Sequence, residues 1–259
     1  MAKLSLNSKW DRGSLRFFDV QSQVNVHTLF NDNHAPVFLD HLVASAQRGS
    51  PEFLMDRVDH FMFLSEDEWT NSATGAGTAV LTDAHGGILL MSPAGADEDE
   101  EVMAHDAETI VPIAAGTDDI WFLANFEIDD ADKVEVNIGL MVADAKVGKH
   151  HTAGGGVTEG IYVNSPFNTA ALNGICTDAS ADTAVALTGL ANGTRTTVGF
   201  HYNNGAVPSV TFVQDGVQSA AVITNIPTGH ELKVTFAVQT GEAALHTMSV
   251  DWYRVMAQI

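Results

Sequence analysis

Acidic residues at short spacing stand out in the stretch FEIDDADKVEVNIGLM, residues 126 to 141. Glu127, Asp129 and Asp132 lie close enough together to act as a group. Paired carboxylates can serve as acid, base or nucleophile in cleaving a glycosidic bond, provided that the fold holds them at a fixed separation. A second interpretation of the same residues is structural: two strands and the polar turn between them. The choice decides whether the sequence predicts an enzyme.

The residues before these acids alternate as a half-buried strand does. In WFLANFEI, residues 121 to 128, Glu127 points to the same side as Asn125, and the apolar side chains take the other side: Phe122, Ala124, Phe126 and Ile128. Asp favours turns and is poor within strands, so residues 129 to 132 predict a turn. The next strand, KVEVNIGLM, alternates Val134, Val136, Ile138 and Leu140 with Lys133, Glu135 and Asn137.

The spacing of Glu127, Asp129 and Asp132 resembles the ExDxxE signature of retaining β-glucanases of the laminarinase type. The resemblance implies two carboxylates that flank the glycosidic bond and a third that orients one of them. In that signature the acids lie on one continuing strand, with apolar residues between them. Here Asp130 occupies an intervening position, Asp132 replaces the final Glu, and the strand ends at Ile128. A turn does not hold two carboxyl groups about 5–5.5 Å apart, as a retaining pair requires. We therefore predict a hairpin with no catalytic residues, and no enzyme.

Composition excludes several classes of protein. The chain has 259 residues, of which 45% are hydrophobic, enough for one large domain with or without an appendage. Its net charge of −21 would repel phosphate backbones, so nucleic acid is not an expected partner. No apolar run approaches the roughly 18 residues of a membrane span, and the N-terminus lacks a signal-peptide core, so no membrane is expected. Cys176 is the only cysteine, which excludes an internal disulfide.

The first 74 residues predict an N-terminal arm and a short helical segment. Four of the 12 basic residues fall within the first 16 positions, near three aromatic residues; the arm residues are Lys3, Lys9, Trp10, Arg12, Arg16, Phe17 and Phe18. One interpretation is a solvated tail, and the other is an arm that docks on an acidic neighbour. Helical spacing follows in APVFLDHLVASAQRG and PEFLMDRVDHFMFL, residues 35 to 64, which predicts one or two short helices.

From about residue 75 to residue 259 the period changes to two, and roughly a dozen short strands without helical crossovers predict an antiparallel sandwich or jelly roll. Asp215-Gly216 predicts a tight hairpin. The Gly run at 154 to 156 and the segment from about 165 to 183 read as loops. In the last two strands we expect Val234, Phe236, Val250 and Trp252 to be buried.

Other chemistry is less well supported by the residue pattern. The run Asp97-Glu-Asp-Glu-Glu101 could be a calcium loop, but adjacent acids cannot all face one ion, and such runs are usually solvated. The pair His150-His151 has no third ligand at a suitable spacing, and Cys176 has no partner signature. Of the four tryptophans, some could form a sugar platform, yet Trp121 and Trp252 lie in strands and read as packing residues. No cofactor or metal is predicted.

The last two-thirds of the chain resembles the concanavalin A-like jelly roll of legume lectins, laminin G modules and laminarinase-type glycosidases. The residues that carry the resemblance are WFLANFEI, VEVNIGL, EGIYV, VTFVQDGVQSAAV, NIPTGHELKVTFAVQTG and TMSVDWYRV. With an aromatic N-terminal arm before it, the whole is similar to virion proteins of tailed bacteriophages, in which such jelly rolls decorate or cement the capsid.

The resemblance implies a non-enzymatic virion structural protein, a capsid decoration protein attached through its N-terminal arm. Its expected partners are the major capsid protein or other virion proteins and copies of itself, and its expected location is the virion, assembled in the host cytoplasm. The alternative is a carbohydrate-binding, lectin-like module for host adhesion, with a glycan as partner. A glycoside hydrolase is the third and most distant hypothesis.

Overall fold

The computed structural model describes residues 54–61, 64, 68–82, 87–106, 110, 112, 119–142, 156–179 and 181–258. Several features singled out in the sequence lie outside these residues. They are the arm from Lys3 to Phe18, the first helical pattern at 35–49 and the pair His150-His151. Predictions about them stay predictions.

The described residues form strands and connections and contain no helix. The strands are β1 (Leu54–Asp59), β2 (Trp69–Ala73), β3 (Thr78–Thr82), β4 (Ile88–Ser92), β5 (Glu100–His105), β6 (Ile120–Ile128), β7 (Val134–Met141), β8 (Gly160–Ser165), β9 (Asn173–Asp178), β10 (Ala181–Ala186), β11 (Thr196–Asn203), β12 (Ser209–Gln214), β13 (Val217–Gln218), β14 (Lys233–Thr240) and β15 (Met248–Gln258). Within this part of the chain, no helix is long and apolar enough to cross a membrane.

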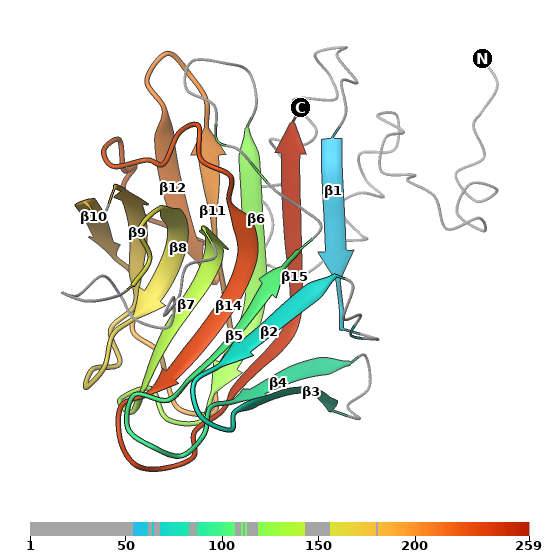
Figure 1. Ribbon diagram of the computed structural model, residues 1–259. Helices are drawn as coiled ribbons and strands as arrows, with labels where there is room; N and C mark the ends of the chain where they lie inside the picture. Colours follow the sequence, from blue (N-terminus) through green and yellow to red (C-terminus); the bar gives the residue numbers. More distant parts are fainter. Residues whose placement is uncertain are drawn as a thin grey trace. The chain divides into compact units, whose positions relative to one another are not determined.

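Two antiparallel sheets make up the fold (Figure 1). The eight-stranded sheet has the order β13-β12-β11-β6-β15-β4-β3, and β1 also pairs with β15. The seven-stranded sheet has the order β10-β9-β8-β7-β14-β5-β2. Consecutive strands such as β6 and β7 lie in different sheets, so the chain crosses repeatedly between the two layers. The mainly β antiparallel sandwich expected from the sequence is therefore present.

Alternation along β6 and β7 builds the interior, as the sequence predicted. The apolar side chains of β6 and β7 that share one face are at most 2% exposed and belong to one core: Phe122, Ala124, Phe126, Ile128, Val134, Val136, Ile138 and Leu140. β6 ends at Ile128 and β7 begins at Val134, with a turn between them. The two strands then enter different sheets, so this corner joins the two layers. The interpretation of the acidic stretch as two strands and a turn is confirmed.

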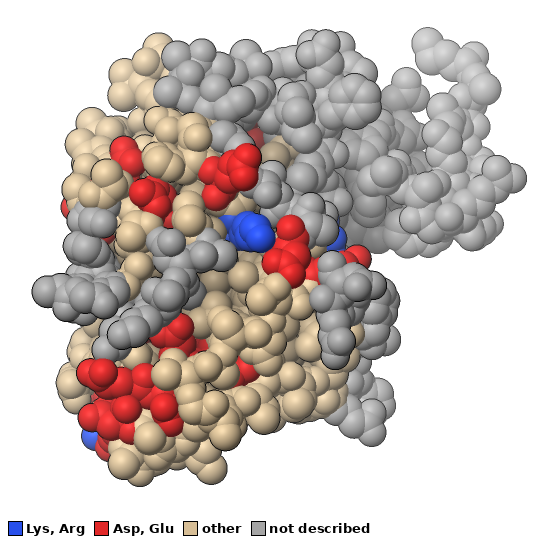
Figure 2. Space-filling view, viewed as in Figure 1, with Lys and Arg blue, Asp and Glu red and all other residues tan. Residues whose placement is uncertain are grey.

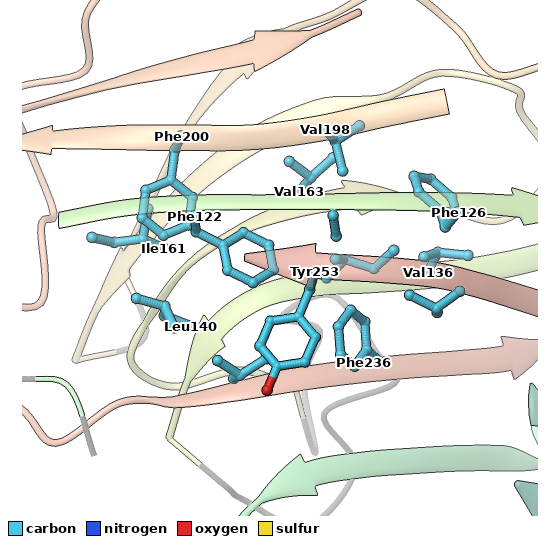
Figure 3. Close-up of a cluster of buried hydrophobic side chains, with 14 of the residues drawn as sticks. Phe122, Phe126, Val136, Leu140, Ile161, Val163, Val198, Phe200, Phe236 and Tyr253 are labelled. Carbon is cyan, nitrogen blue, oxygen red and sulfur yellow. The ribbon is translucent and has the colours of Figure 1, made fainter. Parts of the chain in front are cut away.

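Aromatic rings fill much of the space between the sheets (Figure 3). Phe236 of β14 and Tyr253 of β15 are fully buried, and their ring centroids lie 5.7 Å apart. Phe122 stacks on Phe200 of the neighbouring strand β11 at 5.6 Å. Such contacts contribute beyond the burial of apolar area alone.

The N-terminal boundary of the sandwich differs from the sequence-based expectation. Helical spacing was expected over residues 51–64, but Leu54–Asp59 forms β1 and pairs with β15. Trp69–Ala73 forms β2 and pairs with β5. Pairing with a long strand provides tertiary contacts that override a short helical pattern. The sandwich thus includes strands that precede residue 75.

The segment from 165 to 183, expected to be a loop, contains strand β9 and the start of β10. Asn173, Gly174 and Asp178 belong to residue types that favour turns, so the local sequence does not indicate a strand here. In the structure, a Cβ atom added to Gly174 would lie 2.2 Å from Cγ of Phe212. The ring of Phe212 occupies the space that a larger side chain would need, and this explains why the strand has a glycine at position 174.

The expectation that Trp252 is buried is wrong. The pairing of β15 with β6 shifts between Val250 and Trp252, so Asp251 forms a bulge. An extra residue in one strand reverses the alternation beyond it. Val250 and Tyr253 are fully buried, whereas Trp252 is partly exposed. The bulge therefore moves an indole from the interior to the outward face of the eight-stranded sheet.

The acidic run at 97–101 is not wholly solvated either. Glu100 and Glu101 begin strand β5, and they are 5% and 0% exposed. Glu101 is level with Val238 and Ala73 on the strands that flank β5, and it shares the inward face with Met103. Glu101 is therefore a buried carboxyl group, which the local run of acids could not indicate.

Candidate functional site

The candidate site lies on the outward face of the eight-stranded sheet, where β11, β6 and β15 are neighbours. Cross-strand pairing places Thr197 opposite Asn125, and Asn125 opposite Trp252. These three residues form one row across the sheet. In the adjacent row, Glu127 of β6 lies opposite Ser249 of β15. Because side chains alternate along a strand, Asn125 and Glu127 point away from the core that Phe126 enters.

Arg195, just before β11, joins two carboxylates across this face. Its Nε lies 3.6 Å from Oε2 of Glu127, and its Nη1 lies 2.5 Å from Oδ2 of Asp251. The three side chains are between 33% and 39% exposed. Solvent screens ion pairs at this exposure, so their contribution to folding is small. Their main effect is to orient the guanidinium and the two carboxylates on the face that carries Trp252.

Hydrogen bonds also orient the row that contains Asn125. Its Nδ2 donates to Oγ1 of Thr197 at 2.9 Å. The backbone N–H of Thr197 donates to Oδ1 of Asp215 at 2.8 Å. The amide of Asn125 thus has a defined orientation, and a third carboxylate lies close to the same row.

We call Asn125, Glu127, Arg195, Asp251 and Trp252 the Trp252 surface. It combines a partly exposed indole with an amide, a guanidinium and two carboxylates. An indole can pack against an apolar ligand face, and planar polar groups can exchange hydrogen bonds with hydroxyl groups. This arrangement can bind a ligand that has both an apolar face and many hydroxyl groups.

Among the other acids of the hairpin, Asp129 has a structural partner. His246 lies between two carboxylates, with Nδ1 3.4 Å from Oδ2 of Asp129 and Nε2 3.3 Å from Oε1 of Glu242. Glu242 also pairs with Lys133 at 3.0 Å, and the hydrogen bond from Lys133 holds the pKa of Glu242 below its usual value. The side chain of Asp132 is exposed. Asp129 therefore helps to hold the β14–β15 connection, and the hairpin acids do not face one another across a cleft on a continuing strand.

A second polar cluster lies on the outward face of the seven-stranded sheet. Nδ2 of Asn164 donates to Oε1 of Glu135 at 3.2 Å and to Oδ1 of Asn137 at 2.9 Å. The sequence placed Glu135 and Asn137 away from the core, but they are only 6% and 0% exposed, and Asn164 is 1% exposed. Since ligands need access, this buried cluster serves better as a structural network than as a binding surface.

The described residues contain no group of His, Cys, Asp and Glu side chains suited to holding a metal ion. Cys176 is fully buried among core residues, and burial raises the pKa of its thiol well above the usual value. A buried thiol of this kind is a poor nucleophile.

Sequence reasoning named Asn125, Glu127 and Trp252, but not as parts of a binding surface, and it missed Arg195 and Asp251. Arg195 and Asp251 lie 56 positions apart in the printed sequence, so only the pairing of β11, β6 and β15 brings them together. The local sequence VDW contains no Gly to indicate a bulge. The pair Asn125 and Glu127, polar at alternate positions of an otherwise apolar strand, was the one available signal.

No protein-family model matches the chain, and no curated protein matches it. Solved structures do. Peanut lectin, in a complex with a nine-residue peptide, has a TM-score of 0.56 and 12% identity, covering 79% of this chain and 97% of the lectin. A prokaryotic β-1,3-1,4-glucanase (lichenase) derived from a mouse hindgut metagenome has a TM-score of 0.54 and 12% identity, covering 77% and 98%.

The potassium-bound carbohydrate recognition domain of Emp46p has a TM-score of 0.51 and 8% identity, covering 76% of this chain and 93% of that domain. At these identities the likeness concerns the fold alone. Because the same fold is found in a lectin, a carbohydrate recognition domain and a glucanase, it does not separate binding from catalysis. The chain has the concanavalin A-like jelly-roll fold that its sequence predicted.

Proposed function

We propose that the protein is a carbohydrate-binding module that holds a glycan on the Trp252 surface. The observation that carries the proposal is the bulge at Asp251, which turns Trp252 outward beside Asn125 and the Arg195 ion pairs. A β-bulge often re-aims a side chain at a functional position. The likeness to a lectin and to a carbohydrate recognition domain supports glycan binding, the alternative predicted from the sequence.

The chemistry of sugars suits this surface. A pyranose ring has an apolar face of C–H groups, which can pack on an indole, and a rim of hydroxyl groups, which need donors and acceptors. Glu127 and Asp251 offer acceptors, and the amide of Asn125 offers both kinds of group. Ligand sites commonly combine an aromatic or apolar wall with a few oriented polar groups.

Glycan-array binding followed by calorimetry tests the proposal. Trp252→Ala should weaken binding by about tenfold or more, since a Trp at the centre of an interface often contributes over 1 kcal/mol. Trp252→Phe keeps an aromatic face and should retain most of the affinity. Asn203→Ala is a matched control, because Asn203 is an exposed Asn on the same face of β11, about 20 Å along the strand from Thr197. Absence of binding to every glycan would refute the proposal.

Binding without hydrolysis is part of the proposal. Glu127, the residue that best matched a catalytic carboxylate in the sequence, forms an ion pair with Arg195, and Asp129 contacts His246. A β-glucan hydrolysis assay on the parent and on Glu127→Gln tests this point. Hydrolysis by the parent that disappears in the variant would show that the protein is an enzyme.

Decoration of a virion stays a separate prediction from the sequence. Its residues, from Lys3 to Phe18, lie outside the described part of the chain. A glycan-binding module on a particle surface could serve host adhesion, so the two functions are compatible. Mass spectrometry of intact particles tests the location, independently of any glycan.

A further inference from the structure

The guanidinium group of Arg195, on the Trp252 surface, already forms ion pairs with carboxylates. Arg195 directs Nη1 to Asp251 at 2.5 Å and Nε toward Glu127 at 3.6 Å. Asp215 adds a third carboxylate nearby, bound to the backbone N–H of Thr197. Arg254, two positions after Trp252, is only 9% exposed. The described residues of this surface therefore carry more negative than available positive charge.

Other basic residues in the described part of the chain are paired in the same way. Arg57 contacts Glu68 at 3.0 Å, and Lys233 contacts Asp106 at 3.4 Å. The face seen in Figure 2 also shows more acidic than basic side chains. With a net charge of −21 for the whole chain, the background field also disfavours anions.

Recognition of an acidic sugar needs a cation that is free to accept it. Arginine usually binds a carboxylate or sulfate through two parallel N–H donors. Here those donors face Glu127 and Asp251, so an acidic ligand would have to displace one of them. A hydroxyl group or an ammonium group can instead donate to the carboxylate oxygens that remain exposed.

We propose that the Trp252 surface selects glycans by charge, binding neutral sugars and amino sugars and rejecting sugars that carry carboxylate, sulfate or phosphate groups. Glu127 and Asp251 are the specificity-determining residues, because they occupy Arg195. This inference rests on the proposed glycan-binding function and specifies the class of ligand.

The test uses the full chain and an array that pairs each neutral oligosaccharide with its sialylated, sulfated and amino-sugar counterparts. The parent should bind neutral and amino-sugar members at least about tenfold more tightly than their acidic counterparts, since like charges at an interface are strongly unfavourable. An ammonium group should also strengthen binding relative to the neutral counterpart, because it is attracted to Glu127 and Asp251, and this gain should shrink in high salt.

The variant Glu127→Gln/Asp251→Asn keeps the shapes of both side chains and frees Arg195. It should bind acidic counterparts at least about fivefold more tightly than the parent does, because a bidentate Arg site becomes available. Asp106→Asn is the matched control: it frees Lys233 on the seven-stranded sheet and should leave the selectivity unchanged. Thermal unfolding of each variant verifies that it is folded.

The outcomes separate the two proposals. Equal binding of neutral and acidic counterparts, with both lost in Trp252→Ala, overturns the charge selection and leaves the glycan-binding function in place. Unchanged selectivity in Glu127→Gln/Asp251→Asn overturns the role of the two carboxylates. If no member of the array binds, the function and the selectivity both fail.

Discussion

The carboxyl group of Glu101 lies against the backbone of Gly77, where an added Cβ atom would come within 2.2 Å of Oε2. Glu101 is fully buried, and this burial raises the pKa of its carboxyl group to about 7, although the side chain of Asn71 opposes the shift. Gly77, between β2 and β3, leaves room for the buried side chain. The protonation state of Glu101 therefore changes near neutral pH.

Glu101→Gln should change the pH dependence of stability. In the folded protein the pKa of Glu101 is raised above the ordinary 4.5, so folding favours the protonated form. The folded state therefore loses stability as pH rises from about 4.5 to about 7, and the full cost remains above that range. One pKa unit corresponds to about 1.4 kcal/mol. At pH 8 the free energy of unfolding of the variant should therefore exceed that of the parent by up to about 3 kcal/mol. At pH 4 the two should be similar.

Denaturant unfolding at pH 4, 6 and 8 measures this difference. Asp132→Asn, which replaces an exposed carboxylate of the β6–β7 turn, is the control and should show no comparable gain at pH 8. If the difference in the free energy of unfolding between Glu101→Gln and the parent does not vary with pH, the pKa of Glu101 is not raised by burial.

Phe236→Ala should cost about 3–5 kcal/mol of the free energy of unfolding, the range for a fully packed aromatic residue. Phe236 is 0% exposed, and its ring centroid lies 5.9 Å from that of Trp69 and 5.7 Å from that of Tyr253. Val217→Ala, at a position 66% exposed, should change stability by less than about 0.5 kcal/mol. A loss under about 1 kcal/mol for Phe236→Ala would mean that the core collapses around the missing ring.

Gly174→Ala should destabilise the protein by about 1–3 kcal/mol, because the new methyl group meets the ring of Phe212. Gly205→Ala is the control, since its nearest contact is the side-chain oxygen of Asn203 at 3.1 Å, which can move. Combining Gly174→Ala with Phe212→Leu should cost less than the sum of the two changes, as neighbouring sites couple. Denaturant unfolding measures these losses. If they are additive, the contact between the new methyl group and the ring of Phe212 is not what destabilises Gly174→Ala.

Sequence reasoning predicted the features that depend on local alternation and failed where distant residues decide. Phe122, Phe126 and Val136 were placed correctly because period-two patterning directly reports which face is buried. The position of Trp252 depends on one extra residue in β15, which changes the face of every later side chain but leaves the local composition unchanged. Gly174 depends on Phe212, a residue on a strand of the other sheet. The Trp252 surface could not be predicted, because pairing among three strands brings it together.

Deleting residues 2–18 tests the N-terminal arm, whose role remains a prediction from the sequence. The core of the described residues extends from Phe61 to Ala257, so the truncated protein should stay folded with nearly unchanged thermal stability. If the arm docks on an acidic neighbour, truncation should abolish attachment to particles or self-association. Attachment of the full-length protein should weaken as salt rises, because the charges of Lys3, Lys9, Arg12 and Arg16 are screened.

The measurements are thermal unfolding and co-sedimentation with particles at 50 and 500 mM salt, two ionic strengths that differ about threefold in screening length. Unfolding of the truncated chain, or attachment that survives truncation, would show that these residues are not the attachment device. If the truncated chain is folded, glycan binding at Trp252 should survive the deletion whether or not attachment is lost, since that surface is formed by β6, β11 and β15.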